Sequence, residues 1–145
     1  MGKINLKRVV LGGLLAGLIL NITESVLNIW VVGEQWKQVL EKYGMGESPG
    51  TLVWYYIWGF LTGILIVWIY AAIRPRFGPG PKTAILAGEV VWVSMWFLGF
   101  LGYGISGLFP MDLVFITIIW GFVELAIAGL AGAWLYKEEE TTPTS

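Results

Sequence analysis

The stretch VVLGGLLAGLILNITESVLNIWVV (residues 9–32) decides the fold, because it runs for 24 residues with a single charged side chain, Glu24. A helix of that length rises about 36 Å, which is enough to cross the roughly 30 Å hydrocarbon core of a bilayer. Three more apolar runs of 22 to 25 residues follow it, at 52–73, 84–108 and 113–136. We therefore predict an all-α membrane protein, a bundle of four transmembrane helices.

The chain of 145 residues fits one such domain, predicted at 1–136, with a disordered tail at 137–145. Apolar residues make up 57% of it, charged residues 13%, and the mean hydropathy is +0.73. The net charge of −1 gives no electrostatic reason to expect a nucleic-acid partner. There is no cysteine and no histidine, so thiolate chemistry and the commonest ligand of haem, zinc and copper are excluded. We expect no cofactor, no metal site and no enzymatic activity.

The basic residues divide unequally between the two ends of the predicted spans. Seven fall on one side, and only Lys37 and Lys42 fall on the other. Cytoplasmic loops carry the excess of Lys and Arg, so we expect both termini in the cytoplasm and the chain in the inner (plasma) membrane. The seven cations on the predicted cytoplasmic side are Lys3, Lys7, Arg8, Arg74, Arg76, Lys82 and Lys137.

The predicted outer loop, GEQWKQVLEKYGMGESPG (residues 33–50), contains apolar residues at helical spacing. The residues at this spacing are Trp36, Val39, Leu40 and Tyr43, and Gly44 is suited to end a helix. This pattern predicts a short amphipathic interfacial helix on the outer surface of the membrane. It could act as a lid over an outer opening or as a plain anchor. The anchor interpretation is favoured, because tryptophan is common at membrane–water boundaries.

The predicted inner loop, RPRFGPGPKT (residues 74–83), has three prolines and two glycines, so we expect it to be stiff and non-helical. Thr83 is suited to cap the helix that follows. The cations of this loop have two interpretations. They could be the topology signal that the positive-inside rule requires, which is favoured, or a cradle for an anionic head group. The candidate head-group contacts are Arg74, Arg76 and Lys82.

Polar side chains lie inside the predicted spans. Asn21, Glu24 and Asn28 are spaced three and four apart, so they form a stripe on a helix. Counting about 1.5 Å per residue places Asn21 and Glu124 at equal depth. We therefore expect the stripe to face the fourth helix and to hydrogen-bond to it. The candidate intramembrane polar and proton site comprises Asn21, Glu24, Asn28, Thr62, Glu89 and Glu124.

The spans contain no Lys or Arg to neutralise these carboxylates, and an unpaired carboxylate in hydrocarbon tends to take up a proton. Two interpretations stand as equals. The polar groups could be hydrogen-bonding glue between helices, or they could form a proton or cation path. Trp92 and Trp96 share a face with Glu89 and could line an aromatic box for a lipophilic cation. Core packing, with each indole N–H bonded to a glutamate or a carbonyl, is the favoured alternative.

Small residues recur along the predicted helices. Such residues let helix backbones approach closely, and they could also form a homodimer seam. They are Gly13 and Gly17 in the first helix, Gly59 and Gly63 in the second, and Gly121, Ala128 and Gly132 in the fourth.

Two segments, AAIRPRFGPGPKTAILAG (residues 71–88) and GAWLYKE (residues 132–138), resemble small four-span membrane proteins of many bacterial genomes. No activity is assigned to that group, so the resemblance implies an architecture and carries over no functional residue. Small multidrug-resistance transporters also share four spans, a first-helix glutamate and an aromatic cavity. In this chain, however, Glu24 lies in the outer half of a longer helix, and the surrounding pattern does not match theirs.

The sequence thus predicts a non-enzymatic structural or accessory protein of the lipid bilayer. It could form a homo-oligomer or belong to a larger membrane assembly. The alternative is a small proton- or cation-coupled transporter that uses Glu24, Glu89 and Glu124. A membrane enzyme ranks third, because no nucleophile–base pair or cofactor motif supports it.

Overall fold

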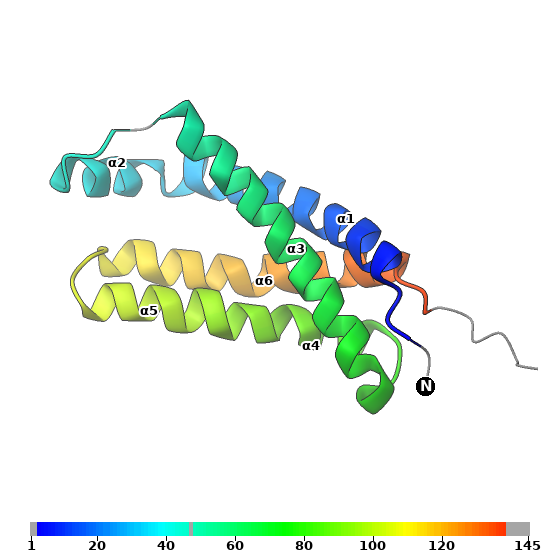
Figure 1. The fold of residues 1–145 in the computed structure, drawn as a ribbon. Coiled ribbons are helices and arrows are strands. Elements are labelled where there is room, and N and C mark those ends of the chain that lie inside the picture. The colour runs from blue at the N-terminus through cyan, green and yellow to red at the C-terminus, as the bar shows by residue number, and fades with distance from the viewer. Residues whose placement is uncertain (1–2, 47, 139–145) are drawn as a thin grey trace, which may run out of the picture.

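The computed structural model describes residues 3–46 and 48–138, and every regular element in these two ranges is helical (Figure 1). Two of the elements, η1 and η2, are π-helical turns inserted into longer helices. The elements in chain order are α1 (Leu6–Val26), η1 (Leu27–Val31), α2 (Gly33–Lys42), α3 (Pro49–Phe77), α4 (Pro81–Val91), η2 (Trp92–Phe97), α5 (Leu98–Ile105) and α6 (Met111–Leu135).

In the described part of the chain, four helices are long and apolar enough to cross a membrane, as predicted. They are Leu6–Val31, which joins α1 to η1, then α3, then Pro81–Ile105, which joins α4, η2 and α5, and finally α6. The second span is longer than the predicted 52–73, because α3 runs for 29 residues. It begins early because the Ser48 side chain accepts a hydrogen bond from the backbone N–H of Thr51.

The inner loop is shorter than predicted, because α3 continues through Arg74 and Arg76 and ends only at Phe77. The expectation of a non-helical segment over 74–83 is therefore wrong. Pro75 lies in the last turn of α3, and the helix ends two residues after it, as expected near a proline. The chain then turns at Gly78 and Gly80, whose φ angles of 82° and 132° favour glycine.

The expectation that Thr83 caps the third span is also wrong. Helix α4 begins at Pro81, and its N-cap residue is Gly80. Thr83 lies within the first turn instead, and its hydroxyl donates to the carbonyl of Gly78 at 2.7 Å. Pro81 suits the first position of a helix, because the N–H that proline lacks would have no intrahelical partner there. Helix α4 therefore begins two residues before the threonine.

Helix α6 is the centre of the bundle, with half of its apolar window buried against about a third of the window in α1 or α3. It contacts α1 and α4 through glycines. A Cβ at Gly132 would lie 3.0 Å from the carbonyl oxygen of Gly12, and one at Gly88 would lie 2.8 Å from the carbonyl carbon of Leu125. The predicted close approach through small residues is confirmed for α6.

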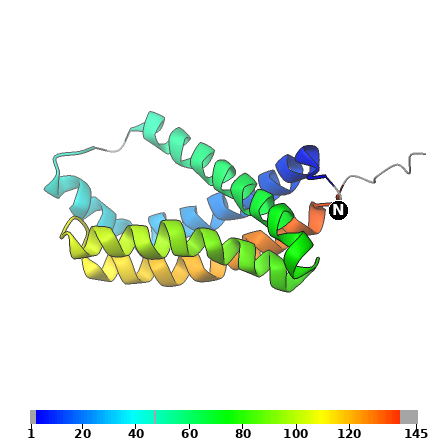
Figure 2. The ribbon, with the colours of Figure 1, turned by 60° about the horizontal axis from the view of Figure 1, so that its bottom comes forward.

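Helices α1 and α3 cross at a second glycine contact, where Gly63 lies directly against Gly13 and Gly17. Beyond this crossing α3 diverges from the rest of the bundle toward its N-terminal end (Figures 1 and 2). All of residues 49–58 are consequently exposed, and Trp54 is 70% exposed. Helices α1 and α3 are thus in close contact at the glycines, whereas the N-terminal end of α3 lies away from the bundle (Figures 1 and 2).

Helix α2 confirms the helix predicted in the outer loop, and Gly44, with a φ of 64°, follows its end. It lies beside the turn between α5 and α6 (Figure 1). The Trp36 ring packs edge-on against Phe109 at 5.1 Å, and the Tyr43 hydroxyl donates to the carbonyl of Leu108 at 2.9 Å. These contacts dock α2 on the bundle end; its location at a membrane surface stays a prediction.

The two chain ends and the α3–α4 turn gather at the opposite end of the bundle (Figure 1). The backbone N–H of Asn5 donates to the Tyr136 hydroxyl at 3.3 Å, and Arg74 pairs with Glu138 at 3.5 Å. The predicted cytoplasmic cations of these segments therefore share one end, whereas the side of the membrane on which that end lies stays a prediction. Most of the tail predicted at 137–145 lies outside the described residues.

Candidate functional site

A network of hydrogen bonds surrounds Glu24 in the half of the bundle nearer α2. The side-chain amide of Asn28 donates to Oε2 of Glu24 at 2.6 Å, and the indole N–H of Trp96 donates to Oε1 at 3.3 Å. The indole N–H of Trp36 in turn donates to the Asn28 carbonyl oxygen at 2.6 Å. Glu24 is thereby connected to η2 on one side and, through Asn28, to α2 on the other.

Both π-helical turns contribute to this network. Asn28 lies in η1 and Trp96 in η2, so each places a donor to Glu24. A π-helical turn changes the direction in which the next side chains point, because it carries an extra residue in the turn. Such turns occur frequently at functional sites.

Glu124, on α6, is a second glutamate inside the bundle and is only 2% exposed. Its Oε2 accepts a hydrogen bond from the Thr23 hydroxyl at 2.5 Å. Its Oε1 has no hydrogen-bond partner among the described residues, and neither has the indole nitrogen of the neighbouring Trp120. One oxygen of Glu124 is therefore buried without a protein donor in residues 3–46 and 48–138.

We call the two glutamates Glu24 and Glu124 the acid pair, because neighbouring residues join them. Thr23, which adjoins Glu24 in the chain, donates to Glu124. The Trp96 indole that bonds Glu24 rests against Gly121, where a Cβ would lie 2.9 Å from its nitrogen, and Gly121 is one turn before Glu124. No Lys or Arg occurs in the four predicted spans, so no cation of those spans balances the pair.

The predicted bond between Asn21 and Glu124 is wrong. The amide of Asn21 donates instead to the backbone carbonyl of Tyr56 at 3.0 Å, and its side chain rests on Gly59 of α3. Thr23 takes the place of Asn21 as the donor to Glu124. Depth along a helix places residues at one level but does not fix direction, and Asn21 and Thr23 differ by about 200° around the axis.

The remaining candidates of the polar site lie outside this network. The hydroxyl of Thr62 donates to the carbonyl of Trp58 in its own helix at 2.9 Å. Glu89 has no hydrogen-bond partner among the residues that the structure describes. It precedes Trp96 by seven residues, which is about 10 Å along the helix. The three span glutamates thus do not form one cluster.

The two candidate aromatic residues have different partners. Trp92 donates its indole N–H to the carbonyl of Ile118 at 2.8 Å, whereas Trp96 donates to Glu24. These are the two bonds expected for the packing interpretation, one to a carbonyl and one to a glutamate. An aromatic box around Glu89 receives no support from this arrangement.

Sequence reasoning missed Thr23, Trp36 and Trp120 as neighbours of the acid pair. Thr23 adjoins Glu24 in the chain, and it lies only about 3 Å in depth from Glu124, which was a usable signal. Trp36 gave no such signal, because its pattern is that of a loop anchor and only the docking of α2 brings it to Asn28. Trp120 precedes Glu124 by one turn, so helical spacing alone could have identified it.

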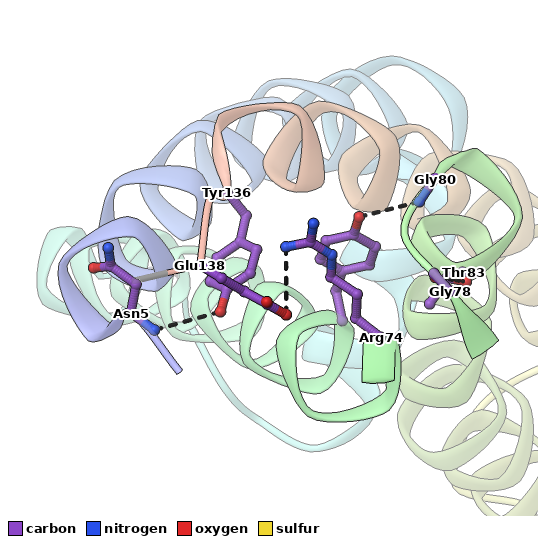
Figure 3. Close-up of polar contacts among 8 residues, drawn as sticks. Asn5, Arg74, Gly78, Gly80, Thr83, Tyr136 and Glu138 are labelled. Atoms are coloured by element: carbon purple, nitrogen blue, oxygen red, sulfur yellow. Dashed lines mark hydrogen bonds and ion pairs between the residues drawn. The ribbon is translucent and has the colours of Figure 1, made fainter. Parts of the chain in front are cut away.

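The predicted basic residues lie at the other end of the bundle, where Figure 3 shows Arg74 beside Glu138 and Tyr136. Arg74 pairs with Glu138 at 3.5 Å, and its guanidinium carbon lies 5.7 Å from the ring centre of Tyr136. Arg74 is therefore partly neutralised, while Arg76 and Lys82 are exposed. A head-group contact at these two exposed cations stays a prediction.

A groove of about 460 Å³ lies between α1 and α3, near the point where α3 diverges. It is open to the outside of the bundle, and its wall is mostly apolar. Two polar side chains of α1 lie on that wall: Asn21, near the middle of the Leu6–Val31 span, and Ser25, one turn further along. Its other walls include Leu18, Ile29, Trp30 and Tyr56.

No protein family model matches the chain, and no curated protein or solved structure is significantly similar to it. The resemblance carried by residues 71–88 and 132–138 stays a prediction.

Proposed function

We propose that the protein is a non-enzymatic accessory subunit of the inner membrane that binds another transmembrane helix in the α1–α3 groove. The observation that carries the proposal is the position of Asn21. Its side chain lies in an open groove near the middle of a span, where a lipid chain offers no hydrogen bond. A polar residue at that depth is expected to face protein, and interhelical hydrogen bonds by amides stabilise such contacts.

The shape of α3 supports the same proposal. Its first ten residues, 49–58, are all exposed and include Trp54, Tyr55 and Trp58. Lipid covers exposed apolar side chains without difficulty, so their exposure alone indicates nothing. The divergence of α3 from α6 matters more, because a tilted helix beside an open groove provides two walls for a partner helix (Figure 2).

Crosslinking in native membranes tests the association. The chain has no cysteine, so Ser25→Cys places a unique attachment point for a photocrosslinker in the groove. The matched control is Ile119→Cys on α6, which is 67% exposed and lies outside the groove. We expect a discrete adduct from position 25 and none from position 119, and its mass distinguishes a second copy from another protein. Equal adducts from both positions, or none from either, would contradict the proposal.

The proposed orientation places both termini in the cytoplasm. Ser48 before α3 and Pro79 in the α3–α4 turn are both exposed and lie at opposite ends of the bundle. In intact cells, a membrane-impermeant thiol reagent should label Ser48→Cys and leave Pro79→Cys unlabelled. The reverse pattern would overturn the orientation.

Proton-coupled transport is the second candidate function, and the acid pair is the observation that favours it. Carboxyl groups inside membrane spans are a recurring element of proton relays. Reconstituted wild-type protein would then conduct protons or cations above the rate of empty vesicles, and Glu124→Gln would abolish that flux. A wild-type rate equal to that of empty vesicles removes this candidate and leaves the accessory role intact.

A further inference from the structure

Three polar side chains follow one another along a buried face of α6. Thr117, Trp120 and Glu124 are spaced three and four residues apart, so they form a stripe on one side of the helix. Thr117 is 3% exposed and Glu124 is 2% exposed. Each of the three has a buried polar atom without a hydrogen-bond partner among residues 3–46 and 48–138: Oγ1 of Thr117, Nε1 of Trp120 and Oε1 of Glu124. We call these three atoms the unpaired stripe.

Thr117 differs from other hydroxyl residues of the spans. The hydroxyls of Ser25, Thr62 and Ser94 each donate to the backbone carbonyl four residues earlier in their own helix. This is the usual way for a threonine or serine in a helix to satisfy its hydroxyl. The hydroxyl of Thr117 has no such bond within the described residues. Both its donor and its acceptor capacity therefore remain free for another group.

Trp120 differs in the same way from the other tryptophans inside the bundle. The indole N–H groups of Trp36, Trp92 and Trp96 donate to Asn28, to a backbone carbonyl and to Glu24 respectively. The N–H of Trp120 is buried and has no acceptor in the part of the chain that the structure describes. A buried donor without an acceptor is costly, and proteins satisfy such groups with ordered water where the chain supplies no partner.

The chemistry of the unpaired stripe restricts what can occupy it. An indole N–H only donates, so the occupant must accept a hydrogen bond from Trp120, which a metal cation cannot do. Oε1 of Glu124 accepts when the carboxyl is ionised, so the occupant must also be able to donate, which a simple anion cannot do. Water donates and accepts, and it suits Glu124 in either protonation state. The hydroxyl of Thr117 can pair with water in both directions.

The position of the stripe indicates that its occupant is enclosed. Thr117 and Glu124 lie about 10 Å apart along the helix axis, so the unpaired atoms extend over two turns and suit molecules that bond to one another. At the end nearer α2, Trp120 packs on a cluster of side chains that are at most 3% exposed. The cluster comprises Leu27, Val32, Val39 and Leu113.

We propose that the unpaired stripe of α6 binds internal water, which accepts from the Trp120 indole and is shared with Thr117 and Glu124. The inference depends on neither of the proposed functions. It adds a binding site for water to a face of α6 that packs inside the bundle, and it gives each of the three unpaired atoms a partner.

Transfer of magnetisation from water protons to indole N–H groups tests the site in the wild-type protein. With isotope-labelled tryptophan and the protein in lipid nanodiscs, the indole N–H of Trp120 should give a direct cross-peak with water. The control is the N–H of Trp92, which donates to the carbonyl of Ile118 at 2.8 Å and should give none. A missing cross-peak at Trp120, or equal cross-peaks at both residues, would overturn the proposal.

Thr117→Val separates bound water from a relayed signal. A threonine hydroxyl exchanges its proton with water and could pass magnetisation to a neighbouring indole, whereas valine has the same shape and no hydroxyl. Trp120 and Glu124 still offer water a donor and an acceptor in this variant, so the Trp120 cross-peak should persist at reduced intensity. Its complete loss would assign the signal to the hydroxyl and refute the site.

The stability of the same variant gives a second test. Thr62→Val is the matched control, because Thr62 is also 3% exposed but donates within its own helix. If water pairs with Thr117, each substitution removes one hydrogen bond, and the two variants should unfold at similar concentrations of denaturing detergent. If the Thr117 hydroxyl were unpaired, removing it would relieve a cost. A distinctly more stable Thr117→Val would therefore contradict the proposal, and the wild-type spectrum remains decisive if either variant fails to fold.

Discussion

The first span, which joins α1 and η1, carries polar side chains on two faces, and the two faces have different surroundings. On the inner face, Thr23 donates to a side chain of α6. Glu24 accepts from a side chain of η2, and Asn28 accepts from a side chain of α2. On the outer face, the Asn21 amide and the Ser25 hydroxyl donate to backbone carbonyls, of Tyr56 and Asn21 respectively, and both side chains line an open groove. The comparison teaches that depth in a membrane and burial in the protein are separate properties. It also suggests that the inner face holds the bundle together and the outer face is available to a partner.

The largest loss of stability is expected from a substitution at the α1–α3 crossing, which separates the two faces. Gly17 lies against the backbone of α3, and a Cβ there would lie 2.6 Å from the Cα of Phe60. Gly17→Leu should therefore force α1 and α3 apart and destabilise the bundle by about 3 kcal/mol or more, which is at or above the usual cost of overpacking. Denaturation of the purified protein in a titration of denaturing detergent measures the loss.

The control for this substitution is Gly102→Leu on α5, where a Cβ would meet nothing within 4 Å. It adds the same side chain to a helix without adding a backbone clash. Equal stability of the two variants would show that the glycine crossing does not hold α1 against α3.

A smaller effect is expected when the inner face loses its central amide. Asn28→Leu leaves the indole N–H of Trp36 and one oxygen of Glu24 without a partner. Leaving a buried polar group unpaired costs about 1–3 kcal/mol, so we expect a destabilisation of about 2 kcal/mol in the same detergent titration. The control is Ser94→Ala, because that exposed hydroxyl bonds only to Val90 in its own helix. If both variants unfold alike, the network around Glu24 contributes nothing to stability.

Glu124→Gln should have a still smaller effect on the stability of the inner face. The amide keeps the shape of a protonated acid, and it retains both a donor and an acceptor. The free energy of unfolding should change by no more than about 1 kcal/mol, the scale of one interhelical hydrogen bond. Glu124→Asp is the useful contrast, because it keeps the carboxyl but shortens its reach to Thr23. Destabilisation by Gln as severe as that by Asp would mean that Glu124 is ionised in the folded protein.

Much of the fold could be predicted from the sequence because helix formation and membrane crossing depend on local composition. The four spans, the glycine contacts and the helix at residues 33–42 all followed from patterns within single segments. The partner of Asn21 could not be predicted in the same way. Its direction depends on where α3 crosses α1, which is a property of two segments 35 residues apart.

The members of the network around Glu24 were predicted in part for the same reason. Glu24, Asn28, Glu124 and Trp96 were singled out as polar or aromatic residues inside the spans, and in the structure Asn28 and Trp96 both donate to Glu24. Glu89 met the same criteria but lies apart from them. The two π-helical turns could not be anticipated, because each inserts a residue into a turn whose sequence is ordinary for a membrane helix.

The smallest expected effect on stability concerns the outer face and is the most informative about function. Asn21→Leu removes one hydrogen bond to the carbonyl of Tyr56, so the bundle should lose only about 0.6 kcal/mol, the average for such bonds in a membrane protein. The crosslink from Ser25→Cys should nevertheless disappear, because the partner helix loses the amide that the groove offers it. Leu18→Ala is the matched control, since it alters the same groove without removing a polar group. Survival of the crosslink in Asn21→Leu, or its loss in both variants, would mean that the amide does not select the partner.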